Sequence, residues 1–188
     1  MKLSIITPTL QRDSLRRCCE SVDRQSYSDW EHIVQVDSSI LDCDLVFPLA
    51  HPSRHFKLCG TCHQDFGNTC RSMGWERSTG DYVLYLDDDN FLAHSEALSD
   101  IAIALESCPE WAVFPILRHG NNFFTDDPRS CHTDTANMVV RRDLACWPSG
   151  PEYTMDGIFC DYLKARYPFA AFGNLKPIVI METSNRGQ

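Results

Sequence analysis

The sequence lacks long apolar runs, an excess of basic residues and any repeated or low-complexity segment. Its opening stretch, MKLSIITPTLQRD, holds too few consecutive apolar residues for a signal peptide, and no later run approaches the ~20 residues of a membrane-spanning helix. Lys and Arg number 17 against 26 Asp and Glu, a formal net charge of −9, which argues against a generic binder of nucleic acid or anionic membrane. We therefore expect a cytoplasmic protein with no transmembrane segment and no nucleic-acid partner.

The chain shows no secretory signal for its ten cysteines, so we expect them to be reduced thiols. One stretch, CGTCH from Cys59 to His63, has a spacing seen in haem attachment and in zinc or redox sites. Haem attachment normally requires export, and a structural zinc site would want a second ligand pair at a suitable spacing. We interpret this stretch, Cys62 included, as a loop with incidental thiols.

What the sequence does contain is an alternation of strand-like and helix-like segments in 188 residues, 43% of them hydrophobic, which suits one globular domain. Apolar runs predict strands at 2–7, 30–36, 44–49, 82–86, 111–117, 136–142 and 177–181. Helical spacing predicts helices at 13–25, 67–78, 95–108 and 156–167. This alternation indicates an α/β fold with a mostly parallel sheet.

Polar residues follow three of the predicted strands, at 7–9, 37–39 and 87–89. In open α/β sheets ligands bind beyond the carboxyl ends of the strands. The segment YVLYLDDDNF brings three aspartates to such an end, where two carboxylates ~5 Å apart repel by on the order of 3 kcal/mol. Bound Mg²⁺ or Mn²⁺ would remove that repulsion. Taken alone, the motif fits a solvated acidic turn equally well.

The stretch CRSMGWERSTGDYVLYLDDDN resembles the signature of family 2 glycosyltransferases with the GT-A fold. Arg71, Gly74, Gly80, Asp87 and Asp89 fall on the signature's Arg, its two glycines and its Asp-x-Asp. SIITPTLQR resembles the first strand of that family, and SVDRQSYSDWEHIVQVDSS resembles its second strand with the Asp that follows. The matching pieces occur in the family's order through most of the first half.

The resemblance implies a single-domain GT-A fold over residues 1–188, with a mostly parallel nucleotide-binding sheet flanked by helices. It assigns residues 1–90 to a nucleotide-donor half and residues 91–188 to a smaller, mixed acceptor half. It also implies metal-dependent, inverting transfer of a sugar from a nucleotide-diphosphate donor, with a UDP-sugar favoured, to a hydroxyl acceptor. The acceptor would be a saccharide, a lipid-linked molecule or a protein, and the cofactor Mn²⁺ or Mg²⁺.

By position, the resemblance implies a set of residues that bind the nucleotide sugar: Thr7, Pro8, Thr9, Asp37, Arg71, Asp87 and Asp88. Asp37 would accept a hydrogen bond from the base, and Asp87 would face the ribose or the sugar. Asp89 would hold the metal that bridges the diphosphate. Asp88 is the variable middle position and ranks below its neighbours.

An inverting transferase also needs a base that deprotonates the acceptor hydroxyl. The family places it in an acidic motif that opens a helix in the second half, and Asp156 in EYTMDGIFCDYL is the matching residue. Its alternative role is helix capping. Asp161 and Glu152 are reserve candidates for the base, and His132 is a reserve candidate for the metal or acceptor.

Two other functions stay open on the sequence. One is a nonenzymatic sugar-nucleotide or metal-binding module with a degenerate acceptor half. The other is a nucleotidyltransferase, which also binds a nucleotide over a metal on an α/β sheet. Such enzymes usually carry a Gly-rich, basic phosphate loop near the start, and TPTLQRD contains no glycine, which disfavours that alternative.

Overall fold

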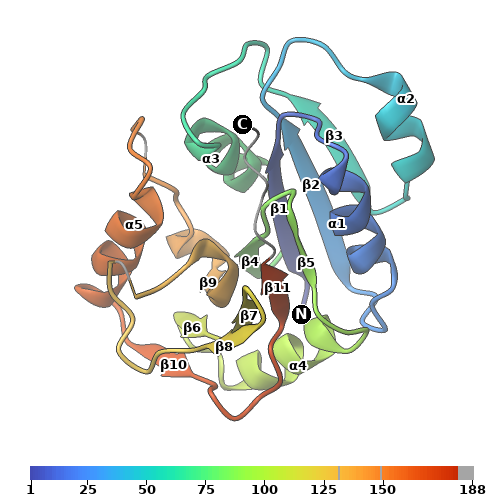
Figure 1. Cartoon of the computed structure of the whole chain (residues 1–188). Helices are drawn as coiled ribbons and strands as arrows, with labels where there is room; N and C mark the ends of the chain where they lie inside the picture. The colour runs from blue at the N-terminus through green and yellow to red at the C-terminus, as the bar shows by residue number, and fades with distance from the viewer. Residues whose placement is uncertain (131, 149, 182–188) are drawn as a thin grey trace.

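A seven-stranded sheet forms the centre of the computed structural model, which describes residues 1–130, 132–148 and 150–181 (Figure 1). In spatial order its strands are β10 (Phe169–Ala171), β6 (Trp111–Val113), β9 (Met138–Arg141), β4 (Tyr82–Tyr85), β1 (Leu3–Thr9), β2 (Trp30–Val36) and β3 (Arg54–Leu58). Strand β9 runs antiparallel to β4 and β6, and the remaining pairs are parallel. The predicted α/β fold with a mostly parallel sheet is confirmed.

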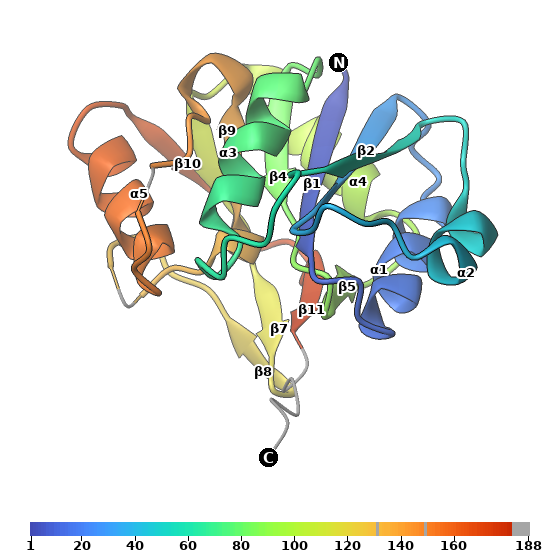
Figure 2. The same ribbon diagram turned by 90° about the horizontal axis from the view of Figure 1, so that it is seen from above.

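A smaller sheet lies beside the large one (Figure 2). Its order is β5 (Asn90–Leu92), β11 (Val179–Met181), β7 (Ile116–Arg118) and β8 (Asn121–Phe123). Strand β11 pairs antiparallel with β5 and parallel with β7, and β7 and β8 form an antiparallel hairpin. This mixed sheet belongs to the second half of the chain except for β5, which follows β4 directly after the three aspartates.

Helices cover both faces of the large sheet (Figures 1 and 2). The helices are α1 (Ser14–Asp23), α2 (Cys43–Val46), α3 (Asn68–Arg77), α4 (Ala97–Ala104) and α5 (Met155–Lys164), and the 3-10 turns are η1 (Phe47–Leu49), η2 (Leu105–Ser107), η3 (Thr135–Asn137) and η4 (Arg142–Leu144). Alternate residues of β1 point to opposite faces. Leu3 and Ile5 pack with buried residues of α1 and α4, whereas Ile6 packs in a second core with buried residues of α5.

One of the predicted strands is wrong, and another is divided into two. Residues 44–49 form α2 and η1 instead, because the Asp42 side chain accepts the backbone N–H groups of Asp44 and Leu45 at 3.1 and 3.2 Å and caps a helical turn. Residues 111–117 form two strands in different sheets, because the chain leaves the large sheet after Val113 at Pro115. The predicted helices at 13–25 and 67–78 are confirmed as α1 and α3.

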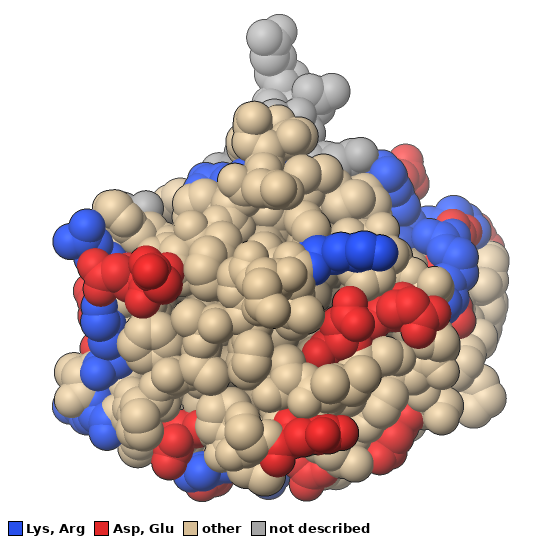
Figure 3. Space-filling view, turned by 90° about the horizontal axis from the view of Figure 1, so that it is seen from below, with Lys and Arg blue, Asp and Glu red and all other residues tan. Residues whose placement is uncertain are grey.

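Among the described residues, no helix is long and apolar enough to cross a membrane. The face seen from below carries Lys and Arg side chains scattered among Asp and Glu rather than joined into a basic surface (Figure 3).

Glu31 of β2 is a buried carboxylate that joins β1, β2 and the turn before β4. It accepts hydrogen bonds from the Ser4 hydroxyl at 2.7 Å, from Lys2 Nζ at 2.8 Å and from the backbone N–H of Thr79 at 2.5 Å. Burial opposes its ionisation, but these hydrogen bonds outweigh burial and lower its pKa to about 2.

We predict that Glu31→Gln lowers the free energy of unfolding by on the order of 2–3 kcal/mol at pH 7, because each pKa unit of native-state depression corresponds to about 1.4 kcal/mol. A depressed carboxylate contributes its stability above the unfolded-state pKa, so the difference from wild type should shrink below pH 4.5 and vanish near pH 2. Urea denaturation across this pH range measures it. The exposed Glu106→Gln is the control, and equal effects of the two variants would contradict the prediction.

Candidate functional site

An open cleft of about 1200 Å³ lies beyond the carboxyl ends of β1, β2 and β4. Eight of the nine predicted site residues line it: Pro8, Thr9, Asp37, Arg71, Asp87, Asp88, Asp89 and Asp156. They come from three neighbouring strand ends, from α3 and from α5. The parallel strand order brings these ends together, which explains why residues up to 148 positions apart (8 to 156) share one cavity.

Thr7 is the predicted site residue that the structure does not bring to the cleft. It is fully buried on the face of β1 that α1 covers, and its hydroxyl lies 2.9 Å from His32 Nε2. Burial and the Arg54 charge lower the pKa of His32, and Arg54 Nε donates to the other ring nitrogen at 3.0 Å. His32 is therefore neutral and donates to Thr7, which places this threonine in a structural network.

The three aspartates after β4 have different surroundings. Asp88 is 1% exposed and accepts a hydrogen bond from the Thr9 hydroxyl at 2.6 Å and an ion pair from Arg12. The side chains of Asp87 and Asp89 are 27% and 24% exposed. Asp88 therefore links the end of β1 and Arg12 to the end of β4, while Asp87 and Asp89 have the more exposed carboxylate oxygens in the cleft.

Arg12 is a site residue that the sequence reasoning missed. Its guanidinium binds Asp88 through two nitrogens, Nε at 3.2 Å and Nη2, and Nη2 lies 3.4 Å from Asp89 Oδ2. These carboxylates raise the pKa of Arg12. Arg12 could have been found from the sequence, because three consecutive aspartates require a nearby cation and Arg12 lies only three residues after the end of β1.

Arg71 of α3 is the second cation of the cleft. It is buried, forms an ion pair with Asp87, donates to the Phe66 carbonyl at 2.8 Å and lies over the ring of Trp147 at 5.1 Å. Its helix lies close to β1 because position 74 is glycine, where an added Cβ would be 2.5 Å from the Ile6 side chain. This contact explains the glycine three residues after the arginine.

Asp89 retains excess negative charge in spite of Arg12. Burial and repulsion from Asp87 and Asp88 raise its pKa, and the Arg12 charge opposes this. Carboxylate oxygens are the ligands that Mg²⁺ and Mn²⁺ prefer. Asp89 therefore fits a divalent cation in this cleft by both its chemistry and its uncompensated charge, and Asp87, which is paired with Arg71, offers a second carboxylate.

Asp37 lies where β2 ends, next to the loop that follows β3. Its carboxylate accepts the backbone N–H groups of His63 at 2.9 Å and of Gln64 at 3.3 Å. Only 5% of Asp37 is exposed, yet it lines the cleft together with Gln64. The loop hydrogen bonds hold the carboxylate in place at the cleft wall.

Asp156 lies in the first turn of α5, and its Oδ1 accepts the N–H of Gly157 at 2.8 Å. Burial raises its pKa, and the backbone hydrogen bond and the Arg71 charge oppose this. Asp134, which sequence reasoning missed, also lines the cleft and has its pKa raised by burial. Among the described residues, the cleft lining does not include the reserve candidates: His132, Glu152 and Asp161.

Comparisons with known proteins find a matching sequence family, a sequence relative and structures of similar fold. A sequence model of the family described as Glycosyl transferase family 2 matches residues 4–169. A curated relative, an uncharacterized glycosyltransferase of Haemophilus influenzae, is 26% identical over 126 residues, which cover 66% of this chain and 48% of the relative. The chain thus spans about half the length of that relative.

Solved glycosyltransferase structures have the same fold. S. aureus TarS in complex with UDP-GlcNAc matches with a TM-score of 0.76 at 16% identity, over 100% of this chain and 60% of that one. A mannosyltransferase of Pyrobaculum calidifontis, in complex with GDP-Man and Mn²⁺, matches with a TM-score of 0.77 at 14% identity, over 98% and 58%. The large sheet and its helices are therefore those of the GT-A fold.

We predict that Arg12→Gln lowers the free energy of unfolding by about 1–3 kcal/mol, because it leaves the buried Asp88 carboxylate without its charged partner. This loss of unfolding free energy is smaller than that expected for a fully buried ion pair, because the Arg12 side chain is 47% exposed. Urea denaturation at pH 7 measures it. The matched control is the exposed Arg16→Gln, expected within ~0.5 kcal/mol of wild type; equal losses would contradict the assigned role of Arg12.

Proposed function

The chain belongs to glycosyl transferase family 2, and we propose that it transfers a sugar from a nucleotide-diphosphate donor to a hydroxyl acceptor in a metal-dependent, inverting reaction. A UDP-sugar is the favoured donor. The observation that carries the proposal is that Asp37, the Asp87–Asp89 group and Asp156 line one cleft. Such a reaction needs three parts: a site for the nucleobase of the donor, a site for its diphosphate, and a general base that takes the proton of the acceptor.

The donor base would lie at the Asp37 end of the cleft, beside Pro8 and Thr9. Asp37 is held by two backbone N–H groups, so its carboxylate is fixed in place before a ligand arrives. A fixed carboxylate accepts a hydrogen bond from a base N–H without the entropic cost of ordering itself. Asp87 would then face the ribose or the sugar.

The diphosphate would lie between Arg71 and the exposed oxygens of Asp87 and Asp89. Asp89 is the residue that would hold Mn²⁺ or Mg²⁺, and the metal, when bound, supplies Lewis-acid stabilisation of the departing diphosphate. Arg71 contributes a buried positive charge, fixed by Asp87 and by the Phe66 carbonyl. A preorganised charge of this kind stabilises negative charge that develops during the reaction.

Asp156 would remove the proton from the acceptor hydroxyl as that oxygen bonds to the anomeric carbon. The bond from that carbon to the diphosphate breaks on the opposite side, and the anomeric centre is inverted. Burial raises the pKa of Asp156 towards the working pH, which improves a carboxylate as a general base. Phe66 and Tyr153, whose rings meet edge to face at 5.2 Å in the cleft, offer the acceptor an apolar surface.

We predict that Asp89→Asn lowers metal-dependent turnover of the preferred donor by about 10³-fold, because the metal stabilises the leaving diphosphate by several kcal/mol. The measurement is nucleotide release from UDP-, GDP- and dTDP-sugars with acceptor, in Mn²⁺ or in chelator. Asp126→Asn, an exposed residue outside the cleft lining, is the control. Turnover that is equal in Mn²⁺ and in chelator would contradict the metal dependence.

We predict that Asp156→Asn lowers kcat by about 10²–10⁴-fold while donor binding is retained. A base works only when ionised, so the wild-type rate should fall as the pH drops through the pKa of Asp156, which lies above the ordinary aspartate value. That acidic limb should be missing from the variant. Asp161→Asn on the same helix is the matched control. Unchanged turnover in Asp156→Asn would favour a binding module instead.

A further inference from the structure

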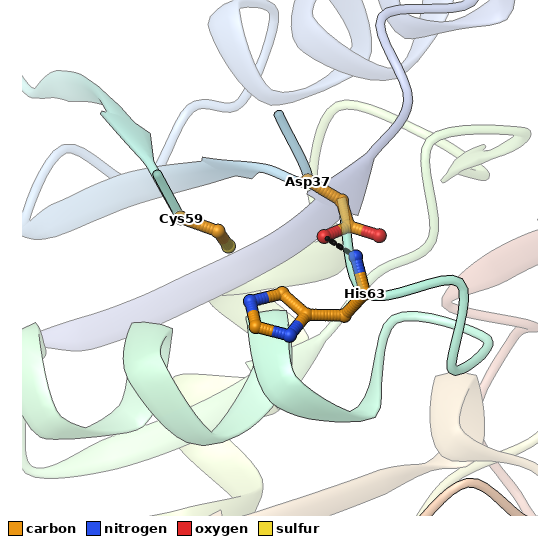
Figure 4. A group of neighbouring side chains, drawn as sticks. All are labelled: Asp37, Cys59 and His63. Atoms are coloured by element: carbon orange, nitrogen blue, oxygen red, sulfur yellow. Dashed lines mark hydrogen bonds between the residues drawn. The ribbon is translucent and has the colours of Figure 1, made fainter. Parts of the chain in front are cut away.

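Asp37, Cys59 and His63 form a second group of ligand-bearing side chains, apart from the three aspartates after β4. One ligand atom of each lies within 4.8 Å of the other two. Figure 4 shows the three side chains near one another, with Cys59 and Asp37 at neighbouring strand ends and His63 on the loop after β3. Cys59 and His63 belong to CGTCH, which the sequence analysis interpreted as a loop with incidental thiols. Asp37 follows the second strand and was predicted separately, as a residue that binds the nucleotide.

The pairing of β2 with β3 explains why these residues meet. Val36 and Leu58 are register partners in this parallel pair, so Asp37 and Cys59 are the next two residues beyond them. The Cys59 N–H donates to the Val36 carbonyl at 2.9 Å and continues the ladder. Four residues later the His63 N–H donates to Asp37 Oδ1 at 2.9 Å, which brings the imidazole back over the strand ends.

We propose that Asp37, Cys59 and His63 bind Zn²⁺. Thiolate, imidazole and carboxylate are the ligand types of zinc sites, and three of them leave a fourth position open. Zinc–ligand bonds of ~2.0–2.3 Å in a tetrahedron place ligand atoms roughly 3.3–3.8 Å apart, so closure requires movements of ~1 Å. One thiolate and one carboxylate balance the charge of the divalent ion.

The surroundings of Cys59 suit a metal-bound thiolate. Gln35 Nε2 donates to Cys59 Sγ at 3.2 Å, and Gln35 Oε1 is itself held by Arg77. Cys70 Sγ lies 3.1 Å from Cys59 Sγ. Donors that hold a ligand's free lone pairs orient it and tune its affinity for the ion. Cys59 is half-buried and His63 is exposed, which gives an ion a path to the site.

If the proposed function holds, zinc at this site would affect binding of the nucleotide donor. Asp37 is the residue proposed to meet the donor base, so an ion bound to Asp37 would exclude the base from that carboxylate. Zinc would then compete with the nucleotide donor at one end of the cleft, while Mn²⁺ or Mg²⁺ would act at the other group, the aspartates after β4.

The test is a titration of Co²⁺, as a spectroscopic substitute for Zn²⁺, into the reduced, metal-free chain in a phosphine reductant. We expect one equivalent to give a thiolate-to-cobalt charge-transfer band and tetrahedral ligand-field bands, and Zn²⁺ to displace it. Cys59→Ser should abolish the charge-transfer band, and His63→Gln should weaken binding at least ~10-fold. Urea transitions confirm that each variant is folded.

Cys43→Ser and His55→Gln, both at exposed positions outside the cluster, are the matched controls and should bind Co²⁺ as wild type does. A wild-type chain without the charge-transfer band, or a band that survives Cys59→Ser, overturns the site. Uridine, which does not chelate through phosphate, should weaken Co²⁺ binding. If uridine leaves Co²⁺ binding unchanged while the charge-transfer band is present, the proposed contact of Asp37 with the nucleobase is contradicted and the zinc site stands.

Discussion

The compensation of negative charge after β4 is the constraint on which the rest of the cleft depends. Three consecutive carboxylates at a buried strand end repel one another by on the order of 3 kcal/mol per close pair. Arg12 from the loop after β1 and Arg71 from α3 each neutralise one of them, Asp88 and Asp87. Asp89 receives only a longer contact, 3.4 Å from Arg12, and its pKa is raised. The structure thereby leaves one carboxylate in need of a cation, at the wall of an open cleft.

The three aspartates look alike in the sequence, but their surroundings in the structure differ. Asp88 is only 1% exposed and its carboxylate binds Thr9 and Arg12, whereas the side chains of its two neighbours in the cleft are about a quarter exposed. Glycine at position 74 lets α3 approach β1, and the approach places Arg71 against Asp87 and Trp147. Packing in the sheet and helix layers thus determines which charges are available for chemistry and which are not.

That Asp37 and the three aspartates after β4 lie at one edge of the sheet could be predicted from the sequence, because they follow apolar strands and parallel strands end at one edge. Arg71 and Asp156 lie on helices and were predicted only from the family resemblance. Thr7 could not be distinguished from Thr9, because residues two apart in a strand share a face. Thr7 lies two residues inside the strand, where its hydroxyl meets His32, whereas Thr9 ends the strand and meets Asp88. Strand β3 was missed because RHFKL has only two apolar residues and lies at the sheet edge. Without β3, the meeting of Asp37 with Cys59 and His63 had no visible cause.

The role of Asp89 in holding the metal is tested most directly by a calorimetric titration of UDP into the wild-type chain and into Asp89→Asn, each with Mn²⁺ and with chelator. We expect Mn²⁺ to strengthen UDP binding by the wild type at least ~10-fold and to leave UDP binding by the variant unchanged. Equal UDP affinity of the wild type in Mn²⁺ and in chelator, or a variant that responds to Mn²⁺ as the wild type does, would contradict the role of Asp89 in holding the metal.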